Sequence, residues 1–217
     1  MIRRIVAGLR DDDGFTLIEL SVAMILSSMV IGTFVTMFFS FTQNAADVTG
    51  KAQQQEDARG VVVGLVVGLR QAVQPGPNSD AIASLTADGI TFYTTDVGSS
   101  TPIKVSYVRS NCVAGECELH VSRFASTGIS GGTYTFSSTP YEQSLLLAGV
   151  LDDQPLFAGE QWSGTPKTLQ VVPSCNGTTV SCSFSLVSVT LRSRPSDTSE
   201  GARTPFEVRE EVRLRNV

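Results

Sequence analysis

The feature that most constrains this chain is an uninterrupted apolar segment near its amino terminus. Residues 15–41 contain one ionisable side chain, Glu19, in the sequence FTLIELSVAMILSSMVIGTFVTMFFSF. As an α-helix this segment is about 40 Å long, enough to span a hydrocarbon core of about 30 Å. No proline occurs before Pro75, so the sequence predicts one continuous helix that begins inside a membrane.

A short polar leader precedes the apolar segment. It carries Arg3, Arg4 and Arg10, and the next Lys or Arg is Lys51. The positive-inside rule counts Lys and Arg and gives acidic residues little weight. We therefore expect a single pass through the cytoplasmic membrane, with the amino terminus inside and the rest of the chain outside.

Two other export signals compete with this interpretation. A cleaved secretory signal has a shorter apolar core and a small-x-small cleavage site, whereas this segment runs into Thr42-Gln43-Asn44-Ala45-Ala46. A plain uncleaved signal anchor fits the segment better. However, a carboxylate inside an apolar helix costs roughly 2.5–3.5 kcal/mol on insertion scales. A simple anchor has no use for Glu19, so this residue indicates a function.

The heptad Gly14-Phe15-Thr16-Leu17-Ile18-Glu19-Leu20 resembles the processing segment of type IV pilin-like precursors. The resemblance implies cleavage between Gly14 and Phe15 by a prepilin peptidase, which also methylates the new amino terminus at Phe15. It also implies that Glu19 pairs with the Phe15 α-amine of a neighbouring subunit during assembly, where a low dielectric strengthens the attraction. One departure is the acidic triplet at residues 11–13, where many members carry Lys or Arg.

The same resemblance implies an α+β, pilin-like fold in which a long helix packs on an antiparallel sheet. We expect a cytoplasmic leader at residues 1–14, a transmembrane and assembly helix at 15–41, its amphipathic continuation at 42–74, and a β-rich head at 75–217. The chain would sit in the lipid of the inner membrane before it joins an extracellular or cell-envelope filament. Residues 147–150, 155–157 and 211–216 resemble, more loosely, the minor pilins related to J-type pseudopilins.

The continuation of the helix contains an apolar stretch and a row of glycines. Residues 61–69 are too short for a second membrane span, so we expect them to be buried against the head. Gly60, Gly64 and Gly68 recur at four-residue spacing and form a narrow face. This face could contact another helix in a filament, or the sheet could pack closely on it. We favour the second alternative.

The head has the sequence pattern of strands and turns. Pro75-Gly76-Pro77-Asn78 ends the helix, and several later segments alternate polar and apolar residues with a period of two. The predicted strands are 89–95, 103–110, 118–124, 133–137, 168–172, 180–191 and 206–214, with the apolar segment 145–151 as a further central strand.

The four cysteines form two close pairs, Cys112 with Cys117 and Cys175 with Cys182. Neither pair has the C-x-x-C spacing of zinc ribbons or thioredoxins. Three connectivities are possible, and the local one is simplest because each pair brackets a Gly-containing turn. Each pair could then staple a hairpin in an oxidising compartment. Two pairs of buried thiols are the alternative.

Groups for catalysis or metal binding are scarce. The single histidine, His120, cannot build a zinc site without thiolates, and we expect it at a surface or edge position. Asp152 and Asp153 could contribute to Ca²⁺ binding or carboxylate catalysis, but a solvated turn is favoured. No nucleophile elbow, Walker loop or dinucleotide motif occurs. We expect no enzyme activity, no cofactor and no metal.

Three functional hypotheses follow from these features. The favoured one is a structural minor pilin or pseudopilin of a type IV pilus or a type II secretion-like filament. The alternative is a membrane-anchored adhesin or hydrolase that acts outside a filament. A DNA-capturing competence pilin would need a basic tip, and a net charge of −5 with no basic run argues against a nucleic-acid partner.

Overall fold

The computed structural model describes residues 16–96, 98–163, 168–172, 174–177, 181–194 and 205–214. The chain forms two compact units, Met1–Thr49 and Gly50–Val217, and each is described by itself. The helix α1, Leu17–Arg70, contributes its first part to one unit and its last part to the other.

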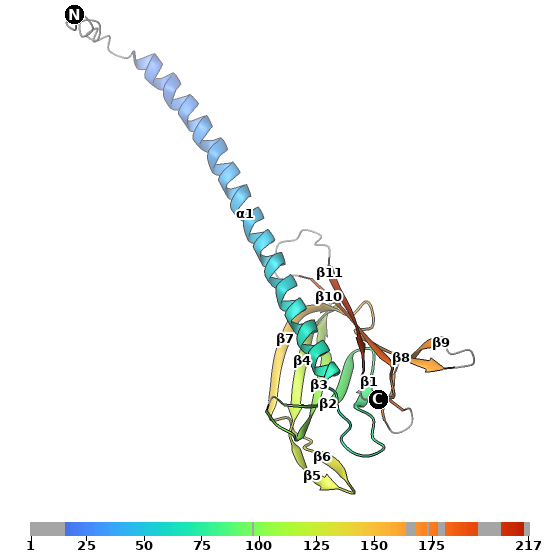
Figure 1. Ribbon diagram of the computed structural model, residues 1–217. Coiled ribbons are helices and arrows are strands. Elements are labelled where there is room, and N and C mark those ends of the chain that lie inside the picture. Colours follow the sequence, from blue (N-terminus) through green and yellow to red (C-terminus); the bar gives the residue numbers. More distant parts are fainter. Residues whose placement is uncertain are drawn as a thin grey trace, which may run out of the picture. The chain divides into compact units, whose positions relative to one another are not determined.

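The second unit adds strands to the end of α1 (Figure 1). Within the described residues these are β1 Ile82–Leu85, β2 Gly89–Thr95, β3 Pro102–Val113, β4 Glu116–Phe124, β5 Ser126–Ser130, β6 Thr133–Phe136, β7 Glu142–Leu151, β8 Phe157–Ser163, β9 Thr168–Val172, β10 Leu186–Ser193 and β11 Phe206–Arg213.

One curled antiparallel sheet forms the body of the head. Its strand order is β1-β2-β3-β4-β7-β10-β8-β9, with β11 paired to β10, while β5 and β6 form a separate hairpin. β10 joins the two halves, because it pairs with β8 at one end and meets β7 through Ser193 and Val150 at the other. A long helix followed by an antiparallel sheet confirms the expected α+β architecture.

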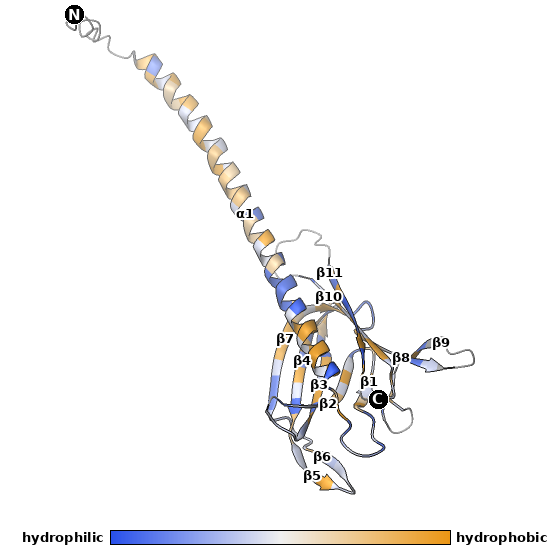
Figure 2. Cartoon of the chain, viewed as in Figure 1, coloured by the Kyte–Doolittle hydropathy of each residue, from blue (hydrophilic) through white to orange (hydrophobic). Residues whose placement is uncertain are grey.

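The first unit contains the apolar part of α1, along which most residues have the hydrophobic colour in Figure 2. An 18-residue window of this helix reaches a mean hydropathy of 2.1, and by length and composition the helix can cross a membrane. Its hydroxyl groups bond within the helix: Ser21, Ser28 and Thr33 donate to the carbonyls of Leu17, Ile25 and Val30 at 2.8–2.9 Å. Such back-bonding lets polar side chains enter an apolar medium.

α1 ends at Arg70, four residues before the predicted end at Gln74. The helix ends there because the backbone of Ala72 and Val73 bonds to β2. Ala72 forms a β-bridge with Thr94, and the Val73 amide donates to the Tyr93 carbonyl at 2.9 Å. The prolines from Pro75 onward are therefore not what stops the helix.

The last part of α1 packs on the sheet through one face. Its buried side chains are Ala58, Val62, Leu65, Val66 and Leu69. The opposite face is open, since Val63 and Val67 are 60% and 46% exposed. The expected burial of residues 61–69 thus applies to a stripe with helical spacing and not to the whole segment.

The expected close packing of the sheet on the glycine row occurs at Gly68 but not at Gly60 or Gly64. A Cβ built on Gly68 would lie 3.2 Å from the Phe92 ring, so the sheet does pack closely there. A Cβ built on Gly60 or Gly64 would meet nothing within 4 Å among the described residues. Close packing of the sheet is therefore the wrong explanation for Gly60 and Gly64, which lie on the exposed face.

A polar contact fixes α1 against the far end of the sheet. The Gln54 amide donates to Ser193 Oγ at 2.6 Å and to the Arg194 carbonyl at 2.7 Å. The Arg194 amide in turn donates to the Gly149 carbonyl at 2.9 Å. Gly149 has a φ of +71°, and a Cβ there would lie 2.4 Å from the Arg194 carbonyl oxygen. Only glycine fits this junction of α1, β7 and β10.

Two glycine substitutions with opposite expected effects test this arrangement. Gly149→Ala should lower the free energy of unfolding by about 2 kcal/mol or more, because it adds both backbone strain and a clash with a carbonyl. Gly64→Ala should leave it unchanged or raise it by up to about 1 kcal/mol, because alanine is the better helix former. Thermal unfolding of the two variants in detergent measures the difference. Equal stabilities would contradict the described junction.

Candidate functional site: the start of the apolar helix

The amino-terminal end of α1 is closed by a reciprocal pair of side chains. The Thr16 hydroxyl accepts a hydrogen bond from the Glu19 amide at 3.3 Å. The Glu19 carboxylate accepts from the Thr16 amide at 3.4 Å and from the Thr16 hydroxyl at 3.2 Å. This is a capping box, in which Thr16 is the N-cap and Glu19 occupies the third helical position.

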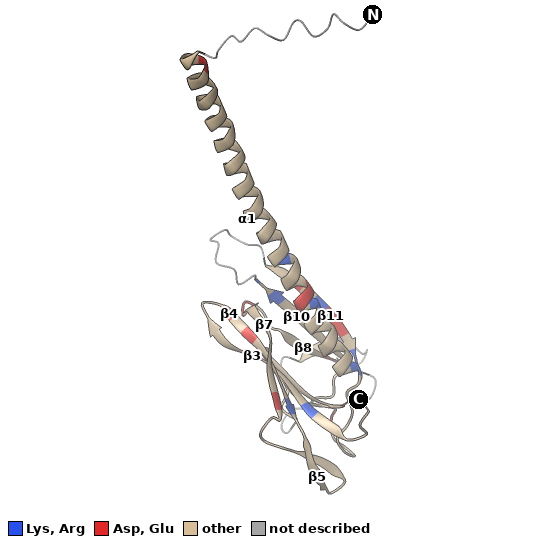
Figure 3. Ribbon diagram, turned by 90° about the vertical axis from the view of Figure 1, so that its left-hand side faces the viewer, with Lys and Arg blue, Asp and Glu red and all other residues tan. Residues whose placement is uncertain are grey.

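The capping box explains why the helix begins where it does. It satisfies amide groups that have no carbonyl partner in the first turn, and it places a negative charge at the positive end of the helix dipole. Figure 3 shows this acidic position at the start of α1. Leu17 and Ile18 beside it are 84% and 73% exposed, so the carboxylate lies among apolar side chains with no protein cover among the described residues.

Of the predicted site residues at this end of the chain, Glu19 is described, whereas Gly14 and Phe15 lie outside the described residues. Sequence reasoning singled out Glu19 but missed Thr16. The signal was available, since a Thr followed three residues later by Glu and then by an apolar run is the signature of a capping box. In the isolated chain Glu19 therefore already has a hydrogen-bonding partner.

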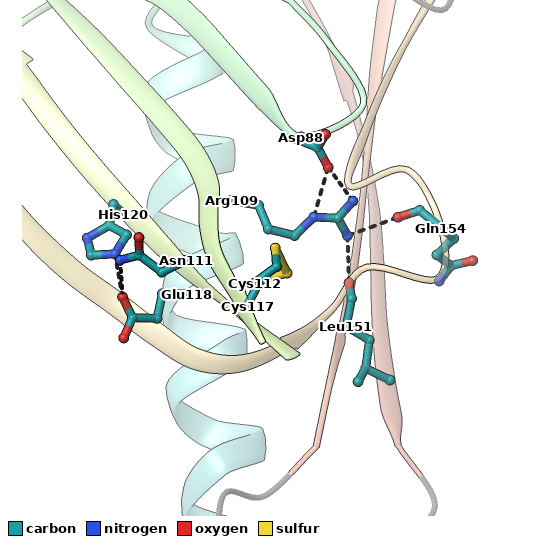
Figure 4. The surroundings of a disulfide bond; sticks show 9 residues. All are labelled: Asp88, Arg109, Asn111, Cys112, Cys117, Glu118, His120, Leu151 and Gln154. Atoms are coloured by element: carbon teal, nitrogen blue, oxygen red, sulfur yellow. Dashed lines mark hydrogen bonds and ion pairs between the residues drawn. A yellow bond between two sulfur atoms is a disulfide. The ribbon is translucent and has the colours of Figure 1, made fainter. Parts of the chain in front are cut away.

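The first pair of cysteines closes the tip of a hairpin. Cys112 of β3 is bonded to Cys117 of β4, with 4.0 Å between their Cα atoms (Figure 4). The turn between them uses Ala114 and Gly115, both at positive φ. This disulfide closes the end of the β3–β4 ladder where its register shifts between Ser110 and Val113.

The second pair is arranged differently from a strand hairpin. Cys175 is bonded to Cys182, and Cys175 forms an isolated β-bridge with Leu85 of β1. β10 begins at Leu186 and not at Val180 as predicted, so Cys182 precedes the strand. The bridge thus closes a loop that is tied to the edge of the sheet, with the Asp80 carboxylate accepting from the Cys182 amide at 2.8 Å.

A buried arginine lies close to the first disulfide. The Arg109 guanidinium is paired with Asp88 and donates to the carbonyls of Leu151 and Gln154 (Figure 4). Its side chain is 5% exposed, whereas that of Asp88 is 59% exposed. The guanidinium therefore ties the β1–β2 turn to β3 and to the end of β7, and we interpret it as a structural clamp.

His120 lies on the outer face of β4, an inner strand of the sheet rather than an edge. Its Nε2 is 2.9 Å from Glu118 Oε2, and the Asn111 amide donates to the same oxygen at 2.7 Å (Figure 4). The Asn111 hydrogen bond, and then that from His120, hold the pKa of Glu118 below its usual value. These three side chains form a hydrogen-bonded surface group.

The acidic turn after β7 has little capacity for a metal. Asp153 is paired with Arg192. Asp152 lies near Cys112 and Cys117, and these three residues are the cluster of possible metal ligands found among the described residues. Since the two sulfurs are bonded to each other, they cannot serve as thiolate ligands.

The described geometry defines a class of protein: a single apolar helix with a capped acidic start, followed by an antiparallel head, is an α+β fold of the pilin-like type. A family model of the prokaryotic N-terminal methylation motif matches residues 9–35. Comparison with curated proteins gives no match, and comparison with solved structures gives none either.

The matched motif covers the end of the leader from residue 9, the predicted cleavage site and the first part of the apolar segment. The chain therefore carries the amino-terminal methylation motif, which supports its resemblance to the precursors of type IV pilin-like proteins that prepilin peptidase processes. Among the described residues one helix is long and apolar enough to span a membrane, and together with the motif it indicates a membrane-anchored, single-pass protein.

The hydrogen bonds from Asn111 and His120 to Glu118 lead to a prediction about pH dependence. Because the pKa of Glu118 is lowered in the folded chain, its contribution to stability is present above its ordinary pKa of 4.5 and is lost as the pH falls through the lower folded value. Asn111 has a φ of 53°, so Asn111→Gly removes the amide and keeps the backbone preference. In this variant the pKa of Glu118 should rise toward its ordinary value.

An NMR titration of the Glu118 carboxyl carbon measures this shift. Asn78→Gly is the matched control, since Asn78 also has a positive φ, of 65°, and does not contact Glu118. An unchanged Glu118 pKa in Asn111→Gly would show that the described hydrogen bond is not what holds the pKa down.

Proposed function

We propose that this protein is a minor pilin or pseudopilin, a structural subunit that enters a type IV pilus or a type II secretion-like filament through its amino-terminal helix. The observation that carries the proposal is Glu19, the only ionisable residue within residues 15–41. A carboxylate there is unfavourable in lipid, and it needs a cationic partner to become favourable.

Processing would supply that partner. Cleavage between Gly14 and Phe15 leaves an α-ammonium at Phe15, and methylation of this amine keeps its positive charge. The amine of a neighbouring subunit would then pair with Glu19 in a low-dielectric environment. In this proposal Glu19 exchanges the neutral contacts of the capping box for an ion pair, and the helix enters the filament as the pair forms.

The exposed face of α1 supports a helical contact as well. Gly60 and Gly64 lie in open space beside exposed Val63 and Val67. Small residues at four-residue spacing let another backbone approach closely. We propose that this face contacts neighbouring subunits, and that the head, held by two disulfides, is displayed in an oxidising compartment outside the membrane.

Two substitutions at Glu19 separate the charge from the cap. Glu19→Ala removes both, whereas Glu19→Gln keeps the capping box, which accepts Glu or Gln at this position. Both should lower incorporation into sheared filaments at least about tenfold, because an unpaired buried charge costs about 3–5 kcal/mol. Both should leave the amount of protein in the membrane fraction unchanged.

Glu56→Gln is the control, since Glu56 lies on the exposed surface of the same helix. It should assemble like the unaltered protein. If Glu19→Gln also assembles like the unaltered protein, the ion pair is not the basis of assembly. If Glu19→Ala fails to reach the membrane, the carboxylate acts in insertion, which would also contradict the proposal.

A further inference from the structure

A polar cavity of about 410 Å³ opens in the head beside the segment that follows α1. Its lining includes Asn78 and Asp80 from that segment, Tyr93 from β2, Tyr134 from β6, and Gly177 from the disulfide loop. These residues are far apart in the sequence, and all belong to the second unit. The proposed assembly function makes no use of this cavity.

The tyrosine-bearing side of the cavity is held by backbone and ring contacts. The Tyr134 amide donates to the Pro75 carbonyl at 2.9 Å, which joins the hairpin β5–β6 to the segment after α1. The Tyr93 ring stacks on Phe136 with 4.9 Å between ring centroids. A Cβ on Gly76 would lie 2.7 Å from the Thr133 Cα, so the two segments are in close contact.

The opposite side is held by the second disulfide. Cys175 is bonded to Cys182 and exchanges backbone hydrogen bonds with Leu85 at 2.9 and 3.0 Å. Gly177 follows at a φ of +67°, and a Cβ there would lie 2.9 Å from the Ala83 carbonyl oxygen. The cavity is therefore preformed, with walls that need little ordering when a ligand binds.

The polar groups of the cavity offer both donors and acceptors. The Asp80 Oδ2 accepts from Ser181 Oγ at 3.0 Å and from the Cys182 amide, so its bonds to described residues leave Oδ1 as an acceptor. The exposed Asn78 contributes an amide, which both donates and accepts. Burial raises the pKa of Tyr93, so its hydroxyl stays protonated and can donate.

We propose that this cavity binds a saccharide. A sugar ring presents C–H groups that pack on an aromatic face, and neighbouring hydroxyls that pair with a carboxylate and an amide. Two tyrosines, one fixed carboxylate and an amide match both features. The described lining contains one carboxylate and no Lys or Arg, which suits a neutral polyol better than a multivalent cation or a phosphate.

Binding of simple methyl glycosides to the full chain tests this proposal. The protein is held in zwitterionic micelles, because detergents with sugar head groups would compete. Saturation-transfer NMR with methyl α-glucoside, α-mannoside, β-galactoside and β-N-acetylglucosaminide should give saturable binding by at least one probe, with a millimolar Kd typical of a ligand this small.

Two variants test whether the glycoside binds in this cavity. Tyr134→Ala should weaken binding of the positive probe about three- to tenfold, since a contact with an aromatic ring is worth about that much. Asn78→Gly, which keeps the positive φ, should weaken it about fivefold through the lost amide. Tyr141→Ala is the control, because Tyr141 is 54% exposed and does not line the cavity.

Three outcomes would overturn the proposal: no saturable binding by any of the four glycosides, binding that Tyr134→Ala and Asn78→Gly leave unchanged, or equal loss in Tyr141→Ala. Thermal unfolding of each variant shows whether the fold is intact, and Tyr134→Phe, which keeps the ring, should retain binding if Tyr134→Ala proves unstable. The result is independent of whether Glu19 drives assembly.

Discussion

The proposed function of this protein depends on one carboxylate at the start of an apolar helix. In the proposed function Glu19 enters a low-dielectric medium, where an ionised group without a partner is strongly disfavoured. In the single chain Thr16 provides hydrogen bonds, and these satisfy the first turn of α1 without neutralising the charge. The proposed function adds a partner that carries positive charge, the α-ammonium that cleavage would create at Phe15 of a neighbouring subunit. Under that proposal one electrostatic requirement connects processing, membrane insertion and assembly.

The head gives the same helix a second, independent role. The last part of α1 is the apolar layer that covers the sheet, and Gln54 fixes its position at the junction of β7 and β10. On the open side of this helix, a Cβ built on Gly60 or Gly64 would meet nothing within 4 Å among the described residues. One helix can thus complete the hydrophobic core of its own head while it presents a narrow surface to other helices. Two disulfides and the buried Arg109 hold turns and strand ends of the head in place.

The sequence predicted the helix, the antiparallel head and the strands with clear alternation, including the bounds of β2 and β9. It did not reveal β1, β5 or β8. β1 has four residues, too few to show a period. β8 contains Gly159, a residue that weakens a strand pattern. Glycine is needed there because a Cβ would lie 2.3 Å from the Phe184 ring, and the sequence does not reveal this tertiary contact. Thr16 could have been found from its spacing to Glu19, whereas the tyrosine-lined cavity could not, because it exists only after distant segments meet.

We propose that the chain is processed between Gly14 and Phe15, so that Glu19 acquires a cationic partner. The most direct test is the intact mass of the protein purified from membranes of cells that contain prepilin peptidase, compared with cells that lack it. We predict a loss equal to residues 1–14 together with the gain of one methyl group at Phe15, only where the peptidase is present. A chain that keeps its leader in the presence of an active peptidase would contradict the account.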